Sequence, residues 1–143
     1  MKYSTDEMQN AYNEMAQKER PILAFVGAIA GSLPAATLYF LMGQMGGVFL
    51  LMLLLPAAVI GIFARFTGFP YRLKPRLVIG ALAFILHILG CWALQLNPLA
   101  YLLAPACAGV AIITSKVKLS RIQEFTLGQV EIGKLSLSSK PKP

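Results

Sequence analysis

Long apolar runs alternate with short charged blocks along this chain. The charged residues fall into three blocks, Lys2–Arg20, Arg65–Arg76 and Lys116–Lys142. Each apolar run between them is long enough for two helices of about 20 residues, the length that crosses ~30 Å of hydrocarbon. The pattern therefore predicts an all-α membrane protein, a bundle of four transmembrane helices near residues 21–42, 46–64, 77–96 and 98–115.

Composition agrees with this prediction. Of the 143 residues, 57% are hydrophobic and 13% are charged, and the mean hydropathy is +0.65. These values are typical of a membrane chain and not of a soluble domain. The formal net charge of +7 comes from basic residues that flank the predicted spans, with little aromatic interleaving, so we expect lipid and not nucleic acid as their partner.

Lysine and arginine also predict the orientation, because cytoplasmic connections are enriched in them. The predicted turns at 43–45 and 95–97 carry no charge, whereas the middle connection and both ends are basic. Both termini are thus expected on the cytoplasmic side of a bacterial inner membrane. The cations expected to fix this orientation and to contact lipid headgroups are Arg65, Arg72, Lys74, Arg76, Lys116, Lys118 and Arg121.

The segment 1–20 predicts a cytoplasmic amphipathic helix. Ser4 and Glu7 have the spacing of a capping box. An apolar stripe follows at helical spacing, so the helix is expected either to lie at the level of the lipid headgroups or to dock on the chain's own basic loop or a partner. The stripe consists of Met8, Ala11, Tyr12, Met15 and Ala16.

The basic tail, residues 116–143, contains one internal repeat. Three five-residue units begin at Phe125, Val130 and Leu135, and Gly128-Gln129 and Gly133-Lys134 fit two-residue hairpin turns. The repeat predicts a small β-meander over residues 125–137. A disordered tail is the alternative, because strands this short are not stable alone.

Small residues and prolines recur inside the predicted spans. Small residues let helices approach closely in a membrane. Each intramembrane proline is expected to kink its span and to free the carbonyl four residues earlier, namely that of Ala30, Met52 or Tyr101. The helix-packing candidates are Gly27, Gly31, Gly80, Ala83, Gly90, Ala104 and Ala108, and the kink candidates are Pro34, Pro56 and Pro105.

His87 is the one ionisable side chain, apart from cysteine and tyrosine, that lies deep in a predicted span. It shares a helical face with small residues, so this face is expected to look into the bundle. The favoured interpretation is a neutral imidazole that is hydrogen-bonded within the bundle. Its candidate partners are Ser32, Thr37, Tyr101 or a carbonyl freed by proline.

Two other interpretations of His87 remain open. A proton or substrate site is one, although the predicted spans lack the Asp or Glu that coupled transport commonly uses. A metal site with Cys91 and Cys107 is the other, although these three ligands have no fourth. Haem ligation by His87 has no further support. We expect no metal and no cofactor.

The sequence predicts a protein that works by interaction and not by catalysis. It contains no G-x-S-x-G, H-E-x-x-H or P-loop motif and no paired carboxylates within the spans. The favoured function is an accessory or scaffold subunit of a larger membrane assembly, with a membrane or cytoplasmic protein, or further copies of itself, as partner. The alternatives are a small oligomeric transporter, channel or hole-forming protein that uses the prolines and His87, and an immunity-type membrane protein.

Overall fold

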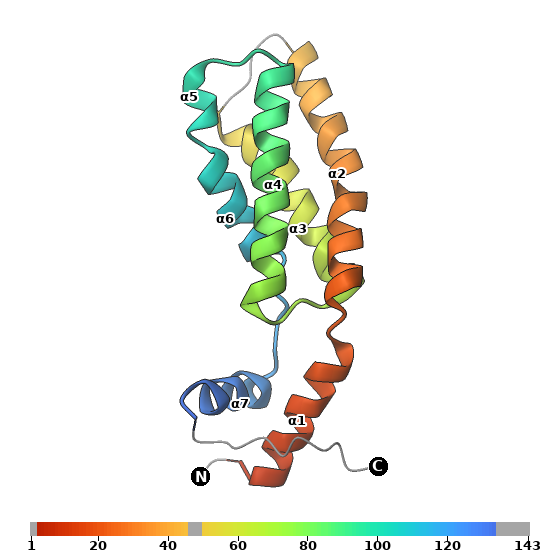
Figure 1. Ribbon diagram of the computed structural model, residues 1–143, viewed down its shortest axis with the longest axis vertical. Coiled ribbons are helices and arrows are strands. Elements are labelled where there is room, and N and C mark those ends of the chain that lie inside the picture. The colour runs from red at the N-terminus through yellow and green to blue at the C-terminus, as the bar shows by residue number, and fades with distance from the viewer. Residues whose placement is uncertain (1–2, 46–49, 134–143) are drawn as a thin grey trace. The chain divides into compact units, whose positions relative to one another are not determined.

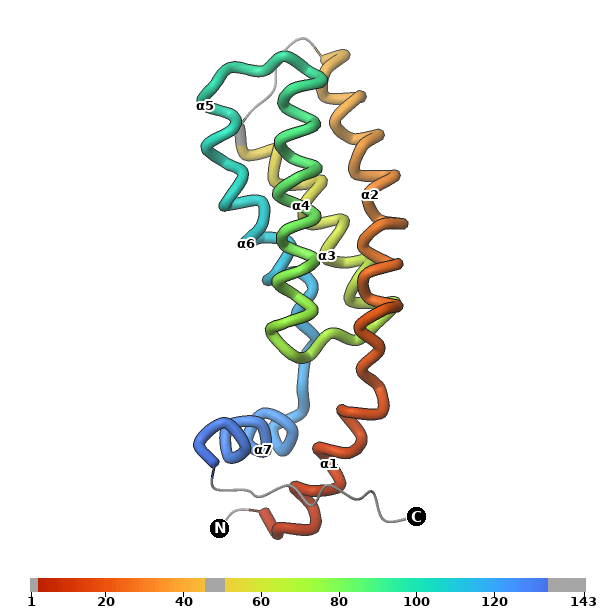
Figure 2. Tube along the Cα trace, viewed as in Figure 1, coloured from red at the N-terminus to blue at the C-terminus, as the bar shows by residue number. Residues whose placement is uncertain are grey.

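The computed structural model describes residues 3–45 and 50–133, and the side chains from residue 51 in the second range. These residues form helices and no strand, so the all-α prediction is confirmed for them. The chain divides into two compact units. We call Arg20–Val117 the bundle, and we call Met1–Glu19 with Lys118–Pro143 the terminal unit. Figure 1 labels the helices of each unit and Figure 2 follows the same chain as a tube.

The bundle contains three helices that are long and apolar enough to cross a membrane, at Pro21–Gln44, Leu51–Gly68 and Leu73–Ala93. A shorter apolar helical segment, Pro98–Thr114, follows them. In Figure 1, α4 lies lengthwise between α2 and α6, and it also packs on α3. The elements are α2 (Pro21–Gln44), the 3₁₀ turn η1 (Leu50–Leu54), α3 (Leu55–Gly68), α4 (Leu73–Ala93), α5 (Pro98–Tyr101) and α6 (Ala104–Thr114).

Small residues fill the bundle and large apolar residues cover it. Leu33, Phe66 and Trp92 are 73%, 81% and 72% exposed. A soluble protein would bury such side chains, whereas lipid solvates them and leaves the helices to associate through small residues. The buried core accordingly includes Ala24, Ala28, Ala35, Ala57, Ala64, Ala83 and Ala111.

The glycines of the predicted packing faces lie where helices approach within the bundle. A side chain at Gly27 would overlap Thr67 of α3, and one at Gly31 would lie 2.8 Å from Phe63 Cβ. Gly80 faces α6, where an added Cβ would lie 2.7 Å from Ile112 Cγ1. These glycines are therefore engaged in contacts inside one chain.

The basic connection between α3 and α4 is shorter than the sequence indicated. Arg65 lies in the last turn of α3, and Lys74 and Arg76 lie in the first turn of α4, so the expectation of a loop over these residues is wrong. The helices extend because long cationic side chains can reach polar surroundings while the backbone stays hydrogen-bonded. Phe69 ends α3 in a left-handed conformation, with φ of 48°.

Two of the three prolines do not kink a continuous helix as expected. Pro56 and Pro105 lie at the first positions of α3 and α6, where a helix needs no N–H donor. Each follows a break, with η1 before α3 and the residues Leu102 and Leu103 before α6. Pro34 does lie inside a continuous helix, α2.

In the terminal unit, α1 (Thr5–Lys18) packs on α7 (Arg121–Glu131). The capping box of α1 is formed: Glu7 N–H donates to Ser4 Oγ at 3.2 Å, and Ser4 N–H donates to Glu7 Oε2 at 2.8 Å. Of the apolar stripe, Met8, Ala11 and Met15 are buried, whereas Tyr12 is half-buried and Ala16 is exposed.

The β-meander prediction is wrong over residues 125–131, because these residues belong to α7. Ser120 and Gln123 form a second capping box, which favours a helix start at Arg121. Thr126, which is fully buried, marks the side of α7 that faces inward. Packing on α1 thus offsets the cost of about 1 kcal/mol for Gly128 within a helix. Lys134 and the third unit of the repeat, which begins at Leu135, lie outside the described residues.

Candidate functional site

A polar cluster around His87 occupies the interior of the bundle. The His87 side chain is fully buried in α4. Its Nδ1 lies 2.8 Å from the Tyr39 hydroxyl of α2, and its Nε2 lies 2.9 Å from the carbonyl oxygen of Ala100 in α5. One imidazole therefore links three helical segments.

The two partners determine where the imidazole proton lies. A carbonyl oxygen can only accept, so Nε2 carries the hydrogen and donates it to Ala100. Nδ1 then offers a lone pair, and the Tyr39 hydroxyl donates to it. Both ring nitrogens are thus engaged in hydrogen bonds within the bundle.

Both cysteines also contact this imidazole. Cys91 Sγ lies 3.4 Å from Nε2, and Cys107 Sγ lies 3.3 Å from Nδ1 and 3.6 Å from the carbonyl oxygen of Leu53. Because the two thiols approach different ring nitrogens, they do not converge with His87 on a common point. Within residues 3–45 and 50–133, no group of three His, Cys, Asp or Glu side chains is arranged to hold a metal ion.

The cluster lies at the two breaks in the bundle's helices. Leu53 is in η1, and in a 3₁₀ turn its carbonyl would accept from Pro56, which has no N–H. Cys107 Sγ provides a donor instead. The Ala100 carbonyl, just before the break between α5 and α6, accepts from Leu103 N–H at 3.2 Å and from His87. Cys107 thus provides the donor that Pro56 lacks, and His87 adds a second donor at the Ala100 carbonyl.

The sequence named the wrong partners for His87. Ser32 and Thr37 instead donate to carbonyl oxygens of their own helix, those of Ile29 and Leu33. The actual partner, Tyr39, continues the buried small-residue face of α2 one turn beyond Ala35. That spacing of four residues was the signal in the sequence that could have identified it.

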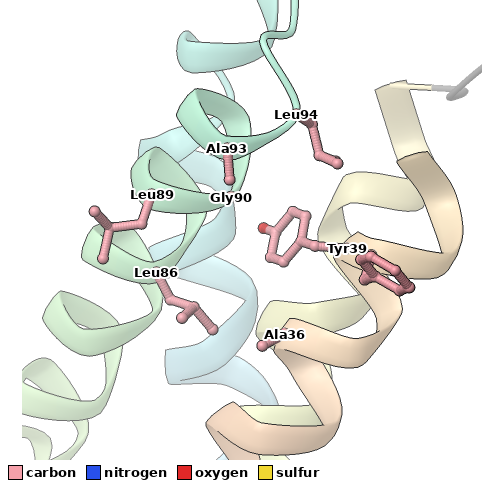
Figure 3. A pocket seen from close by; sticks show the side chains of 8 residues that line it. Ala36, Tyr39, Leu86, Leu89, Gly90, Ala93 and Leu94 are labelled. Atoms are coloured by element: carbon pink, nitrogen blue, oxygen red, sulfur yellow. The ribbon is translucent and has the colours of Figure 1, made fainter. Parts of the chain in front are cut away.

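Gly90 determines how closely Tyr39 approaches α4. A Cβ at Gly90 would lie 2.9–3.0 Å from three carbons of the Tyr39 ring. Figure 3 shows the ring between α2 and α4, at an apolar groove whose walls come from both helices. The groove is lined by Ala36, Tyr39, Phe40, Leu86, Leu89, Gly90, Ala93 and Leu94. Tyr39 therefore both lines this groove and contacts His87.

A second polar contact closes the end of α6. Arg76 donates from Nε and Nη2 to the carbonyl oxygen of Ile112, at 3.1 and 2.8 Å. This carbonyl is among the last four of α6, which have no partner within the helix, and Ser115 Oγ also donates to it at 2.9 Å. Arg76, which the sequence assigned to lipid headgroups, therefore caps a helix of its own chain.

The remaining residues predicted from the sequence lie outside the His87 cluster. Ala83 and Ala104 are buried in the bundle, and the Ala108 carbonyl would lie 3.2 Å from a Cβ at Gly80. The Arg65 guanidinium lies 6.0 Å from the centre of the Phe66 ring, and Arg72 donates to the Tyr71 hydroxyl at 3.0 Å. The side chains of Lys74, Lys116, Lys118 and Arg121 are exposed.

No protein-family model matches this chain, and no curated protein or solved structure shows significant similarity to it. The functional argument therefore depends on the residues and contacts described above.

Proposed function

We propose that this protein is a non-enzymatic scaffold or accessory subunit of a bacterial inner-membrane assembly, with its terminal unit as the part that binds a partner. The observation that carries the proposal is that α1 and α7, which precede and follow the bundle, pack together in a compact unit of their own. A protein that served only as a membrane anchor would need no such unit. A protein that presents a recognition surface beside the membrane needs a folded unit outside it.

The same observation supports four crossings. Because α1 precedes the bundle, α7 follows it, and the two pack together, both ends lie on one side of the membrane. The number of crossings must then be even. Three helices are long and apolar enough to cross, and we infer that Pro98–Thr114 is the fourth. At 1.5 Å per residue it spans about 25 Å, which a slightly thinned bilayer accommodates.

The charge distribution supports the cytoplasmic side for both ends. Four cations lie where α2 begins, α3 ends and α4 begins: Arg20, Arg65, Arg72 and Lys74. The connection at the opposite end of α4, from Leu94 to Asn97, has no charge. Cytoplasmic connections carry the excess of lysine and arginine.

The interior of the bundle supports a structural role for His87. Throughout the part of the chain that the structure describes, every buried side-chain nitrogen and oxygen has a hydrogen-bond partner. His87, Tyr39 and Cys107 bind each other and the protein's own backbone. Such a cluster holds the broken helices together without a ligand.

The test separates the terminal unit from the bundle. Met15→Asp places a charge in the buried contact between α1 and α7, whereas Ala16→Asp places the same charge on an exposed neighbouring position. We expect Met15→Asp to lose the proteins that co-purify in mild detergent and Ala16→Asp to retain them. Equal recovery of partners with both variants, in protein that is equally well inserted, would contradict the scaffold proposal.

A small transporter or channel is the second candidate. Discontinuous helices that meet near a buried polar side chain are a feature of transport sites, and here two breaks meet at His87. This candidate requires that transport be lost when the imidazole is replaced by a side chain that maintains its hydrogen bonds.

A further inference from the structure

One face of α7 in the terminal unit combines exposed apolar and basic side chains. Arg121, Phe125, Gly128 and Ile132 follow at spacings of four, three and four residues and so form one stripe. Phe125 is 37% exposed and Ile132 is 68% exposed. The buried Thr126 lies on a different side, so contact with α1 does not cover this stripe.

An aromatic pair and basic residues extend the same stripe. The Tyr3 ring, next to the N-cap of α1, lies 5.6 Å from the Phe125 ring, centre to centre. Exposed Lys118 lies just before α7, and exposed Arg121 begins it. Tyrosine, phenylalanine and cations beside an aliphatic residue are the combination that settles at the headgroup level of an anionic membrane.

The length of the chain keeps this unit near a bilayer. Only Glu19 and Arg20 separate the end of α1 from Pro21, the first residue of α2. Three residue steps reach about 10 Å at most, so α1 ends that close to a helix that is able to cross the membrane. The helix packed on α1 is therefore confined to the neighbourhood of the lipid surface.

We propose that the stripe Arg121–Phe125–Gly128–Ile132 of α7 is a lipid-binding face, which rests on the headgroup layer of an anionic bilayer. Phe125 and Ile132 enter the boundary between headgroups and acyl chains, and Lys118 and Arg121 contact lipid phosphates. The proposal goes beyond the scaffold role, because it assigns this face to lipid and leaves the polar face of α1 for a protein. That face includes Asp6 and Asn10.

Tryptophan fluorescence tests the proposal, because the chain has a single tryptophan, Trp92. In a Trp92→Phe background, Ile132→Trp places a probe on the stripe and Glu131→Trp places one on the adjacent exposed side of α7. Phe125→Trp provides a second probe that preserves an aromatic residue. Each full-length variant is purified and placed in nanodiscs of phosphatidylcholine, with or without phosphatidylglycerol.

The expected result is specific to position and lipid. With phosphatidylglycerol, the emission of the Ile132→Trp and Phe125→Trp variants should shift to shorter wavelength, be quenched by lipids brominated near the headgroup, and be shielded from iodide. The probe in the Glu131→Trp variant should stay accessible to iodide. High salt should weaken the shielding, because it screens contacts between cations and phosphates.

Two outcomes would overturn the proposal. If the probes at positions 131 and 132 are equally accessible to iodide in both kinds of nanodisc, the stripe does not bind lipid. If the probe at position 132 is shielded equally with and without phosphatidylglycerol and is not quenched by brominated lipid, a protein surface covers it. The purified protein is measured without any partner, so the result is independent of the co-purification test with Met15→Asp.

Discussion

Replacing His87 with leucine should destabilise the bundle chiefly through a different residue, Tyr39. Leucine removes the acceptor of the Tyr39 hydroxyl, which lies 2.8 Å from Nδ1, in a side chain that is 5% exposed. The Ala100 carbonyl loses one donor but retains Leu103 N–H. The Cys107 thiol retains the Leu53 carbonyl. One polar group, the Tyr39 hydroxyl, is thus left without a partner.

The hydrogen bond between Tyr39 and His87 defines how much stability the His87→Leu variant should lose. A stranded buried hydroxyl costs about 1–3 kcal/mol in soluble proteins, and hydrogen bonds between membrane helices average about 0.6 kcal/mol with a maximum near ~1.7. We therefore expect His87→Leu to lower the free energy of unfolding by about 1–2 kcal/mol. Tyr39→Phe should cost a similar amount, because Nδ1 loses its donor and the single hydrogen of the Cys107 thiol already goes to the Leu53 carbonyl.

A double-mutant cycle isolates the contact. Tyr39→Phe with His87→Leu leaves neither partner stranded, so the double variant should lose less stability than the sum of the two single variants. Unfolding of the purified protein in mixed micelles, followed by circular dichroism, measures all four species. If the two losses simply add, the hydrogen bond between Tyr39 and His87 does not contribute as argued.

His87→Gln provides the functional control for the same site. A glutamine amide has both a donor and an acceptor, so it can engage Ala100 and Tyr39, but it does not titrate. The structural role predicts that stability and function largely return with glutamine and not with leucine. A variant that is as stable as the wild type but has lost all function would refute that role and favour the transporter.

Two further substitutions test the packing and the capping of the bundle. Gly61→Ala would place a Cβ 2.5 Å from a backbone carbonyl oxygen of α6 and should lower the free energy of unfolding by about 1–3 kcal/mol. Gly109→Ala, whose Cβ would meet no atom within 4 Å, should be neutral or stabilising by about 0.5–1 kcal/mol. Thermal unfolding compares the two variants, and equal effects would contradict the close approach of the helices at Gly61. Arg76→Leu should lower the free energy of unfolding by about 1–2 kcal/mol, because the Ile112 carbonyl oxygen loses its arginine donor. Lys74→Leu, at an exposed position, should lower it little in the same assay. Similar losses would show that Arg76 acts only by its charge near lipid.

Features that depend on nearby residues could be predicted from the sequence. The capping box of Ser4 and Glu7 depends on a spacing of three residues, and the structure contains a helix with this cap. Of the predicted apolar stripe, Met8, Ala11 and Met15 are buried, whereas Tyr12 is half-buried and Ala16 is exposed. The same holds for the face of α4 that carries Ala83, His87 and Cys91, which are all buried.

Features that depend on distant segments could not be predicted in this way. The repeat from Phe125 predicted strands by its spacing, whereas contact with α1, which lies more than 100 residues earlier, favours a helix. Tyr39 and His87 are 48 residues apart, and nothing local to either residue identifies the other. The sequence indicated a satisfied histidine but not what satisfies it.

The position of the helix breaks explains why a bundle built largely from small and apolar residues contains an imidazole. A break inside a membrane exposes carbonyl groups that lipid cannot satisfy, so a polar side chain must reach them. Cys107 reaches the Leu53 carbonyl, and His87 accepts from Tyr39 while it adds a donor to the Ala100 carbonyl, which already accepts from Leu103 N–H. The polar atoms of this cluster are thus used by the protein's own backbone. Under the proposed function, recognition would fall to the lipid-facing exterior of the bundle and to the terminal unit.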